Sequence, residues 1–100
     1  MRYDTEVFFQ KITPGEYDVR TGNYLPDTVA EHRYYANVTD AGTDTMNLVY
    51  GHVQQGAKVI RIRGILTADY DYIRIGDKRY RVDMQRTLRM EQTFTVSEVQ

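Results

Sequence analysis

The chain has 100 residues, no cysteine and a formal net charge of −1 at pH 7. This length fits one domain that buries about two-thirds of its unfolded surface, and the lack of cysteine excludes disulfides and thiolate metal sites. No apolar run approaches the ~20 residues that cross a bilayer, and residues 1–6 lack the apolar core of a signal peptide, so we expect a soluble, intracellularly made protein with no membrane partner.

Two alternating stretches make up half of the first 40 residues. The pattern predicts a strand from Tyr3 to Ile12, with Val7 and Phe9 on one face, and another from Ala30 to Thr39. Between them, residues 13–16 (Thr-Pro-Gly-Glu) fit a type II turn, with proline second and glycine third. Residues 17–20 can pair back as a short hairpin, residues 21–23 turn again, and residues 26–27 mark an open connection.

Residues 39–45 are polar, with Asp40 and Asp44 among threonines and a glycine. We expect a loop here that is mobile in the isolated protein and becomes ordered against a partner. Apolar side chains then recur at i, i+3 and i+4, namely Met46, Val49 and Tyr50. With Asp44 available as N-cap and Gly51 as the stop, this spacing predicts a short helix near residues 45–50. A strand over residues 46–53 is the competing interpretation.

The second half begins with a predicted strand over residues 57–66, in which Ile60 and Ile62 alternate with Arg61 and Arg63. Residues 67–71 form a polar connection. A long final strand is predicted from Leu88 to Val99. One face of it would carry Leu88, Met90, Phe94 and Val96, with Gln92 interrupting, and the other Thr87, Arg89, Glu91, Thr93 and Thr95.

A β-hairpin over residues 72–82 is the most strongly patterned element. A two-residue Gly76-Asp77 loop sets Ile73 opposite Tyr80, so that the apolar side chains share one face. A three-residue loop would break this match, whereas a four-residue loop would keep it. Glycine followed by aspartate suits a type II′ turn, or I′ if both residues have positive φ. The expected buried side chains are Ile73, Ile75, Tyr80 and Val82, and the expected exposed ones are Arg74 and Arg81.

Five to six short strands with frequent turn signals predict a mainly β fold: a small antiparallel β-barrel or sandwich with one short helix, in a single domain over residues 1–100. We expect no catalytic, cofactor-binding or metal site. His32 and His52 have no second ligand at metal spacing, and nothing near Asp69 and Asp71 would raise the pKa of either carboxyl as a catalytic acid requires. The sequence also lacks a nucleophile with a neighbouring base and a glycine-rich phosphate loop.

Charge is divided between the halves: residues 1–50 carry eight acids against four bases, and residues 51–100 carry nine bases against six acids. Such a division can favour head-to-tail packing of copies, although charged strand faces also simply keep a domain soluble. The candidate interface residues are Arg61, Arg63, Arg74, Arg79, Arg81, Asp40 and Asp44. Arginines with Tyr72 among them also suit a small barrel that binds single-stranded nucleic acid. Interspersed acids and the acidic net charge favour subunit contacts instead.

Several segments resemble small minor capsid proteins of tailed phages and prophages of Gram-positive bacteria, which are encoded among head–tail connector genes. The segments are YANVTDAGTD (35–44), VYG (49–51), KVIRIR (58–63), YIRIGDKRYRVD (72–83), LR (88–89) and TFTVSEV (93–99). The resemblance covers roughly residues 30–100, and its motifs are those of strands and turns. The group is similar in layout to head-closure (stopper) proteins.

The resemblance implies an architectural role, in which a ring of copies below the portal and its adaptor joins the DNA-filled head to the tail and gates the DNA channel. The implied partners are other copies of the chain, portal or adaptor proteins and tail proteins, with DNA only passing through. The implied location is the virion, after synthesis in the host cytoplasm. A small β-barrel that binds single-stranded nucleic acid is the alternative.

Overall fold

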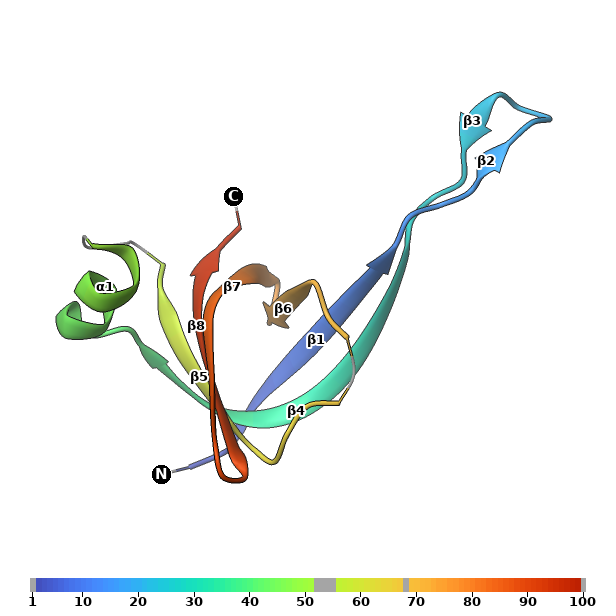
Figure 1. Cartoon of the computed structure of the whole chain (residues 1–100). Coiled ribbons are helices and arrows are strands. Elements are labelled where there is room, and N and C mark those ends of the chain that lie inside the picture. The colour runs from blue at the N-terminus through green and yellow to red at the C-terminus, as the bar shows by residue number, and fades with distance from the viewer. Residues whose placement is uncertain (1, 52–55, 68, 100) are drawn as a thin grey trace.

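The computed structural model describes residues 2–51, 56–67 and 69–99. Its elements in order are β1 (Thr5–Thr13), β2 (Tyr17–Asp18), β3 (Asn23–Tyr24), β4 (Thr28–Asp40), α1 (Thr43–Tyr50), β5 (Lys58–Arg63), β6 (Tyr72–Ile75), β7 (Lys78–Leu88) and β8 (Glu91–Glu98). Six strands close an antiparallel barrel in the order β1-β4-β5-β8-β7-β6, and β2 and β3 form a separate two-stranded sheet. The prediction of a small antiparallel barrel with one short helix is confirmed (Figure 1).

The barrel interior is filled by inward-facing side chains, as in other small barrels. The fully buried ones are Val7, Phe9, Ala36, Ile60, Ile62, Ile73, Phe94 and Val96. Phe9 lies at the centre, with its ring centroid 5.3 Å from Tyr34, 5.3 Å from Tyr70 and 5.4 Å from Phe94. Tyr70 comes from the connection before β6, so a segment that reads as polar in sequence also contributes to the core.

Gln92, the polar residue that interrupts the apolar face of β8, is buried because it has defined partners. Its Oε1 accepts a hydrogen bond from the Leu66 amide at 2.6 Å, and its Nε2 donates to Thr87 Oγ1 at 3.2 Å. The side chain therefore fastens the connection after β5 to the barrel, where an apolar residue would leave the Leu66 amide without this partner.

The β6–β7 hairpin has the predicted register, with Ile73 opposite Tyr80 and Ile75 opposite Lys78. Gly76 has a φ of 60°, and Asp77 is not among the positive-φ residues, which fits type II′ rather than I′. Ile73 and Tyr80 are buried, whereas Ile75 and Val82 are half-buried against the core. Arg81 is exposed, but Arg74 is half-buried, which corrects the expectation for that residue.

The prediction of one strand from Leu88 to Val99 is wrong. β7 continues to Leu88, the chain turns at residues 89–90, and β8 returns from Glu91. Arg89 has a φ of 56°, and Leu88 and Met90 are 70% and 68% exposed at this hairpin rather than inside with Phe94.

A β-bulge in β7 explains which side chains face out. Val82 pairs with Val96, yet Met84 already pairs with Thr95, so Asp83 is the extra residue. Beyond the bulge the alternation is shifted by one, as an inserted residue requires. Gln85 then lies opposite Phe94, and the outward set becomes Met84, Arg86 and Leu88.

α1 packs on the outside of the barrel through a second apolar cluster, in which Ala41, Ala57 and Val59 are buried beneath Met46 and Tyr50. The Tyr50 hydroxyl donates to Asp83 Oδ2 at 2.5 Å, and burial raises the pKa of Tyr50 to about 12. The helix is confirmed over the competing strand, but it begins at Thr43, so the expected loop over 39–45 is reduced to residues 41–42. Its mobility stays a prediction, to be tested by hydrogen exchange.

β1 pairs along its full length with residues 28–36 of β4, and the two strands extend beyond the barrel as a two-stranded ribbon that ends in the β2–β3 sheet (Figure 1). We call residues 14–27 the arm. The type II turn predicted at 13–16 is wrong, because the arm's two chain segments run side by side here and Gly15 lacks the positive φ that such a turn requires. Glycine is needed for a different reason: a Cβ at Gly15 would overlap the Leu25 carbonyl. The expectation that residues 17–20 pair back on the first strand is therefore wrong: Tyr17 and Asp18 form β2, which pairs with β3.

Candidate interaction surfaces

The arm exposes apolar side chains that have no core to join. Val19 is 83% exposed, Tyr24 75%, Tyr17 54% and Leu25 49%. Tyr17 and Tyr24 are paired across the sheet, with ring centroids 5.3 Å apart. Large apolar side chains that are exposed together in one short segment commonly mark a site of protein contact.

A polar network holds the base of the arm to the barrel. Glu31 on β4 accepts from Arg74 Nε on β6 at 2.7 Å and from Gln10 Nε2 on β1 at 2.8 Å. Gln10 is buried, and its Oε1 accepts from Arg79 Nε at 2.9 Å. The hydrogen bond from Arg74 is the main reason that the pKa of Glu31 lies below its usual value. Four strands are joined in this way at the point where the ribbon leaves the barrel.

Asp71 holds the adjoining part of β1. Its Oδ2 accepts from the Ile12 amide at 2.8 Å, its Oδ1 lies 3.4 Å from Lys11 Nζ, and its own amide donates to the Gln10 carbonyl. The Ile12 hydrogen bond lowers the pKa of Asp71, the direction opposite to that of a catalytic acid. Asp69, the other carboxylate considered in the sequence, is exposed.

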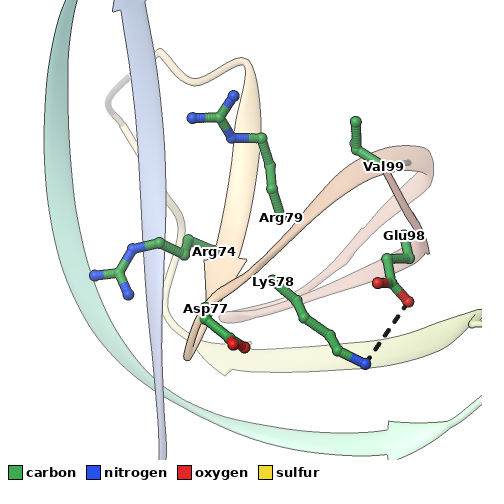
Figure 2. A pocket seen from close by; sticks show the side chains of 6 residues that line it. All are labelled: Arg74, Asp77, Lys78, Arg79, Glu98 and Val99. Carbon is green, nitrogen blue, oxygen red and sulfur yellow. Dashed lines mark ion pairs between the residues drawn. The ribbon is translucent and has the colours of Figure 1, made fainter.

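A shallow hollow of about 400 Å³ lies beside this network, and Figure 2 shows the side chains that line it. Lys78 Nζ approaches Glu98 Oε2 at 3.9 Å across the hollow, next to Asp77. Arg74 and Arg79 point away from this pair, each toward its own partner. With acids and bases mixed and its arginines already occupied, the hollow is not a concentrated anion site.

A different surface carries arginines that have no acidic partner. On the outer face of β5, β8 and β7, the cross-strand pairs form three adjacent rows: Val59-Thr95-Met84, Arg61-Thr93-Arg86 and Arg63-Glu91-Leu88. We call these nine residues the outer face. Within the part of the chain that the structure describes, no carboxylate lies within ion-pair distance of Arg61 or Arg86. Strand spacing places their backbones about 10 Å apart.

The outer face is hollowed along its length. A cavity of about 120 Å³ beneath Leu48 of α1 is lined by the Val59 and Arg61 rows. A second cavity, of about 220 Å³, is lined by residues of the Arg61 and Arg63 rows. Leu48 itself is 77% exposed at the rim. At the far end Arg63 lies over the Tyr3 ring, 4.5 Å from its centroid, beside the exposed Leu88 and Met90.

The candidate interface residues are therefore divided among three places. Arg61 and Arg63 lie on the outer face, and Arg74 and Arg79 hold the arm base. Arg81 is bonded to Asp83 and Ser97 beside α1, and Asp40 pairs with Lys58 at 2.8 Å. The side chain of Asp44 lies outside the described residues. Arg86 and the arm are not among the candidates predicted from the sequence. Arg86 comes beside Arg61 only through the register after the bulge.

The acidic and basic halves of the sequence do not form two separate surfaces. β6 pairs with β1 and β5 with β4, so acids of the first half neutralise bases of the second, as in Glu31–Arg74 and Asp40–Lys58. Charge separation survives only locally, on the arm and on the outer face.

Among the described residues, no group of three or more histidine or carboxylate side chains is placed to hold a metal ion, and no helix is long and apolar enough to cross a membrane. His32 is exposed on β4, and His52 lies outside the described residues. Comparisons with protein-family models, curated proteins and solved structures found no significant match.

Proposed function

We propose that this protein is a structural component of a tailed-phage head–tail connector, in which copies form a ring that links the DNA-filled capsid to the tail. The observation that carries the proposal is the arm, a ribbon on a barrel with a filled interior, which presents four large apolar side chains to solvent. Such a feature adds little to the stability of one copy and suits contact with a neighbour. The resemblance to minor capsid proteins supports the same role.

The proposed role is non-enzymatic. Its partners are further copies of the chain and the portal, adaptor and tail proteins, and its place is the virion. A head-to-tail contact generates a closed ring when the rotation between copies allows closure. Each contact can be weak, because the contacts repeat and a larger connector can template them.

Mass measurement of the protein, alone and mixed with a portal–adaptor complex, tests this proposal. We expect a monomer or weak oligomer alone and a defined ring on the connector. The variant Arg61→Glu/Arg63→Glu should fold normally, because both side chains lie on the outside of β5, but should not assemble. The matched control is the charge reversal Asp77→Lys on the exposed β6–β7 turn, outside the arm and outside β5. Wild-type protein that stays monomeric and does not bind the connector would contradict the proposal.

The alternative, binding of single-stranded nucleic acid, predicts tight and salt-sensitive DNA affinity through the same arginines. Three of the five candidate arginines are already engaged by Glu31, Gln10 and Asp83, which weakens this reading. A titration with single-stranded DNA at low salt separates the two functions. Micromolar or tighter affinity that is lost in Arg61→Glu/Arg63→Glu would favour the alternative.

A further inference from the structure

We infer that the arm of one copy docks on the outer face of the next copy, so that each molecule contributes one arm and one face. This inference rests on the proposed ring and names the two surfaces that would form each joint. The occupant of the outer face is a second copy of this chain.

Charge complementarity is the first support. The arm and the two residues after it, 14–29, carry Glu16, Asp18 and Asp27 against Arg20, a net charge of −2. The outer face carries three arginines against Glu91, a net charge of +2. Because Arg61 and Arg86 have no acid in ion-pair range among the described residues, an incoming carboxylate would find donors that are not already paired.

The apolar parts also correspond. The arm presents Val19 and Tyr24 at its exposed end, and the outer face is bordered by Leu48 at one end and Leu88 at the other, each at least 70% exposed. Between these leucines, the two cavities are lined by strand residues that include Val59, Met84, Thr93 and Thr95. The two-stranded tip of the arm, with its aromatic side chains, can fit into the hollowed outer face.

The geometry excludes contact within one copy and favours a head-to-tail arrangement. The molecule measures 53 × 29 × 22 Å, and the β2–β3 tip and α1 lie at opposite ends of it (Figure 1). The arm, whose base carries the hydrogen bonds of Glu31, Gln10 and Asp71, therefore points away from its own outer face. Repetition of an arm-to-face contact is heterologous, which leads to a ring or a filament rather than a reciprocal pair.

Cysteine cross-linking tests the inference cleanly, because the natural chain has no cysteine. We would combine Val19→Cys on the arm with Leu48→Cys or Leu88→Cys at the two ends of the outer face, and treat with a short cysteine-to-cysteine cross-linker at increasing protein concentration. All three residues are exposed, so the substitutions should not disturb folding. At least one pair should give a ladder of dimers, trimers and larger species. The matched control, Val19→Cys with Asp77→Cys on the exposed β6–β7 turn, should give none.

Charge reversal provides a rescue test. Glu16→Arg/Asp18→Arg on the arm, or Arg61→Glu/Arg86→Glu on the face, should each lower the cross-linked fraction at least about tenfold through like-charge repulsion. The protein that carries all four changes should recover most of the wild-type yield. A general folding defect would not be rescued in this way.

The outcomes separate this inference from the proposed function. Dimers that never extend to trimers would support the arm-to-face contact but contradict the ring. A ring detected by mass, with cross-linking no stronger than in the control, would overturn the arm-to-face contact and leave the ring intact. If neither cross-linked species nor a ring forms, at millimolar protein or on the connector, the arm-to-face contact and the proposed ring are both overturned.

Discussion

The barrel and the arm are built from the same kind of element, the antiparallel strand, but they use apolar side chains in opposite ways. In the barrel each strand has two hydrogen-bonded neighbours, and Phe9, Ile73 and Phe94 are wholly enclosed. In the arm two strands of two residues pair only with each other, and Val19 and Tyr24 are mostly exposed. Burial therefore accounts for the apolar residues of the barrel but not for those of the arm, for which we propose an intermolecular contact.

The largest expected difference is in the free energy of unfolding. Ile73→Ala removes a fully buried side chain from the barrel and should cost about 2–4 kcal/mol, while Val19→Ala at the arm tip should change stability by less than about 0.5 kcal/mol. Urea denaturation followed by circular dichroism measures both. Equal costs at the two sites would mean that the arm is part of the folding core, and the comparison would fail.

The difference between elements with a buried apolar face and the arm, which has none, also determines how much of the structure the sequence could predict. The β6–β7 hairpin was predicted with its register because its apolar alternation and its Gly76-Asp77 turn agree, and only one loop parity satisfies both. The apolar spacing predicts a helix near residues 45–50, and the structure has one at Thr43–Tyr50. In these elements, local pattern and burial point to the same answer.

The sequence-based predictions were wrong where a bulge interrupted the apolar alternation of a strand, and where a segment had no buried face to produce such an alternation. The bulge at Asp83 moves Leu88 to the outside, and nothing in the alternation of β7 indicates an inserted residue. The arm has no buried face, so Pro14 and Gly15 read as a local turn, although Gly15 serves the close approach of two segments ten residues apart. Arg86 was missed for the first reason, since the bulge places it beside Arg61.

Gly15→Ala should disrupt the arm and leave the barrel intact. The added Cβ would overlap the Leu25 carbonyl, and steric crowding of this kind typically costs about 1–3 kcal/mol locally. Hydrogen exchange of the Leu25 amide, which donates to the Glu16 carbonyl at 2.7 Å, should accelerate while barrel amides keep their protection. Gly42→Ala is the matched control, because Gly42 has no positive φ and open space around its Cβ position. Unchanged exchange at Leu25 would show that the arm accommodates a side chain there.

Tyr50→Phe should cost about 1 kcal/mol, since it removes the hydrogen bond that ties α1 to Asp83 of the barrel. The pKa of Tyr50 is raised from 10.0 to about 12 in the folded protein, so the unfolded chain releases the phenol proton first. The advantage of the wild type over Tyr50→Phe should therefore be complete below pH 10 and disappear as the pH rises through 12. Paired urea titrations across this range measure it. A constant difference between the two proteins would contradict the assignment.

The smallest expected effect lies where the two regions meet, at the base of the arm. The Arg74 and Gln10 hydrogen bonds hold the pKa of Glu31 below its ordinary value of 4.5, so the unfolded chain takes up this proton more readily than the folded one. The stabilisation is thus present above pH 4.5 and is lost as the pH falls through the lower folded-state pKa. Glu31→Gln should be slightly less stable than the wild type at neutral pH and equal to it in acid.

The Glu31 effect should be small because the ion pair is partly open to solvent, with 32% of the Glu31 side chain and 31% of the Arg74 side chain exposed. Its more informative consequence is local: hydrogen exchange in residues 10–13 and 28–31 should accelerate in Glu31→Gln before that of the barrel core does. Glu16→Gln, at a carboxylate with no ion pair among the described residues, should leave both stability and exchange unchanged. If the arm base is unaffected in Glu31→Gln, then backbone pairing between β1 and β4 alone orients the arm, and the polar network serves only the hollow beside it.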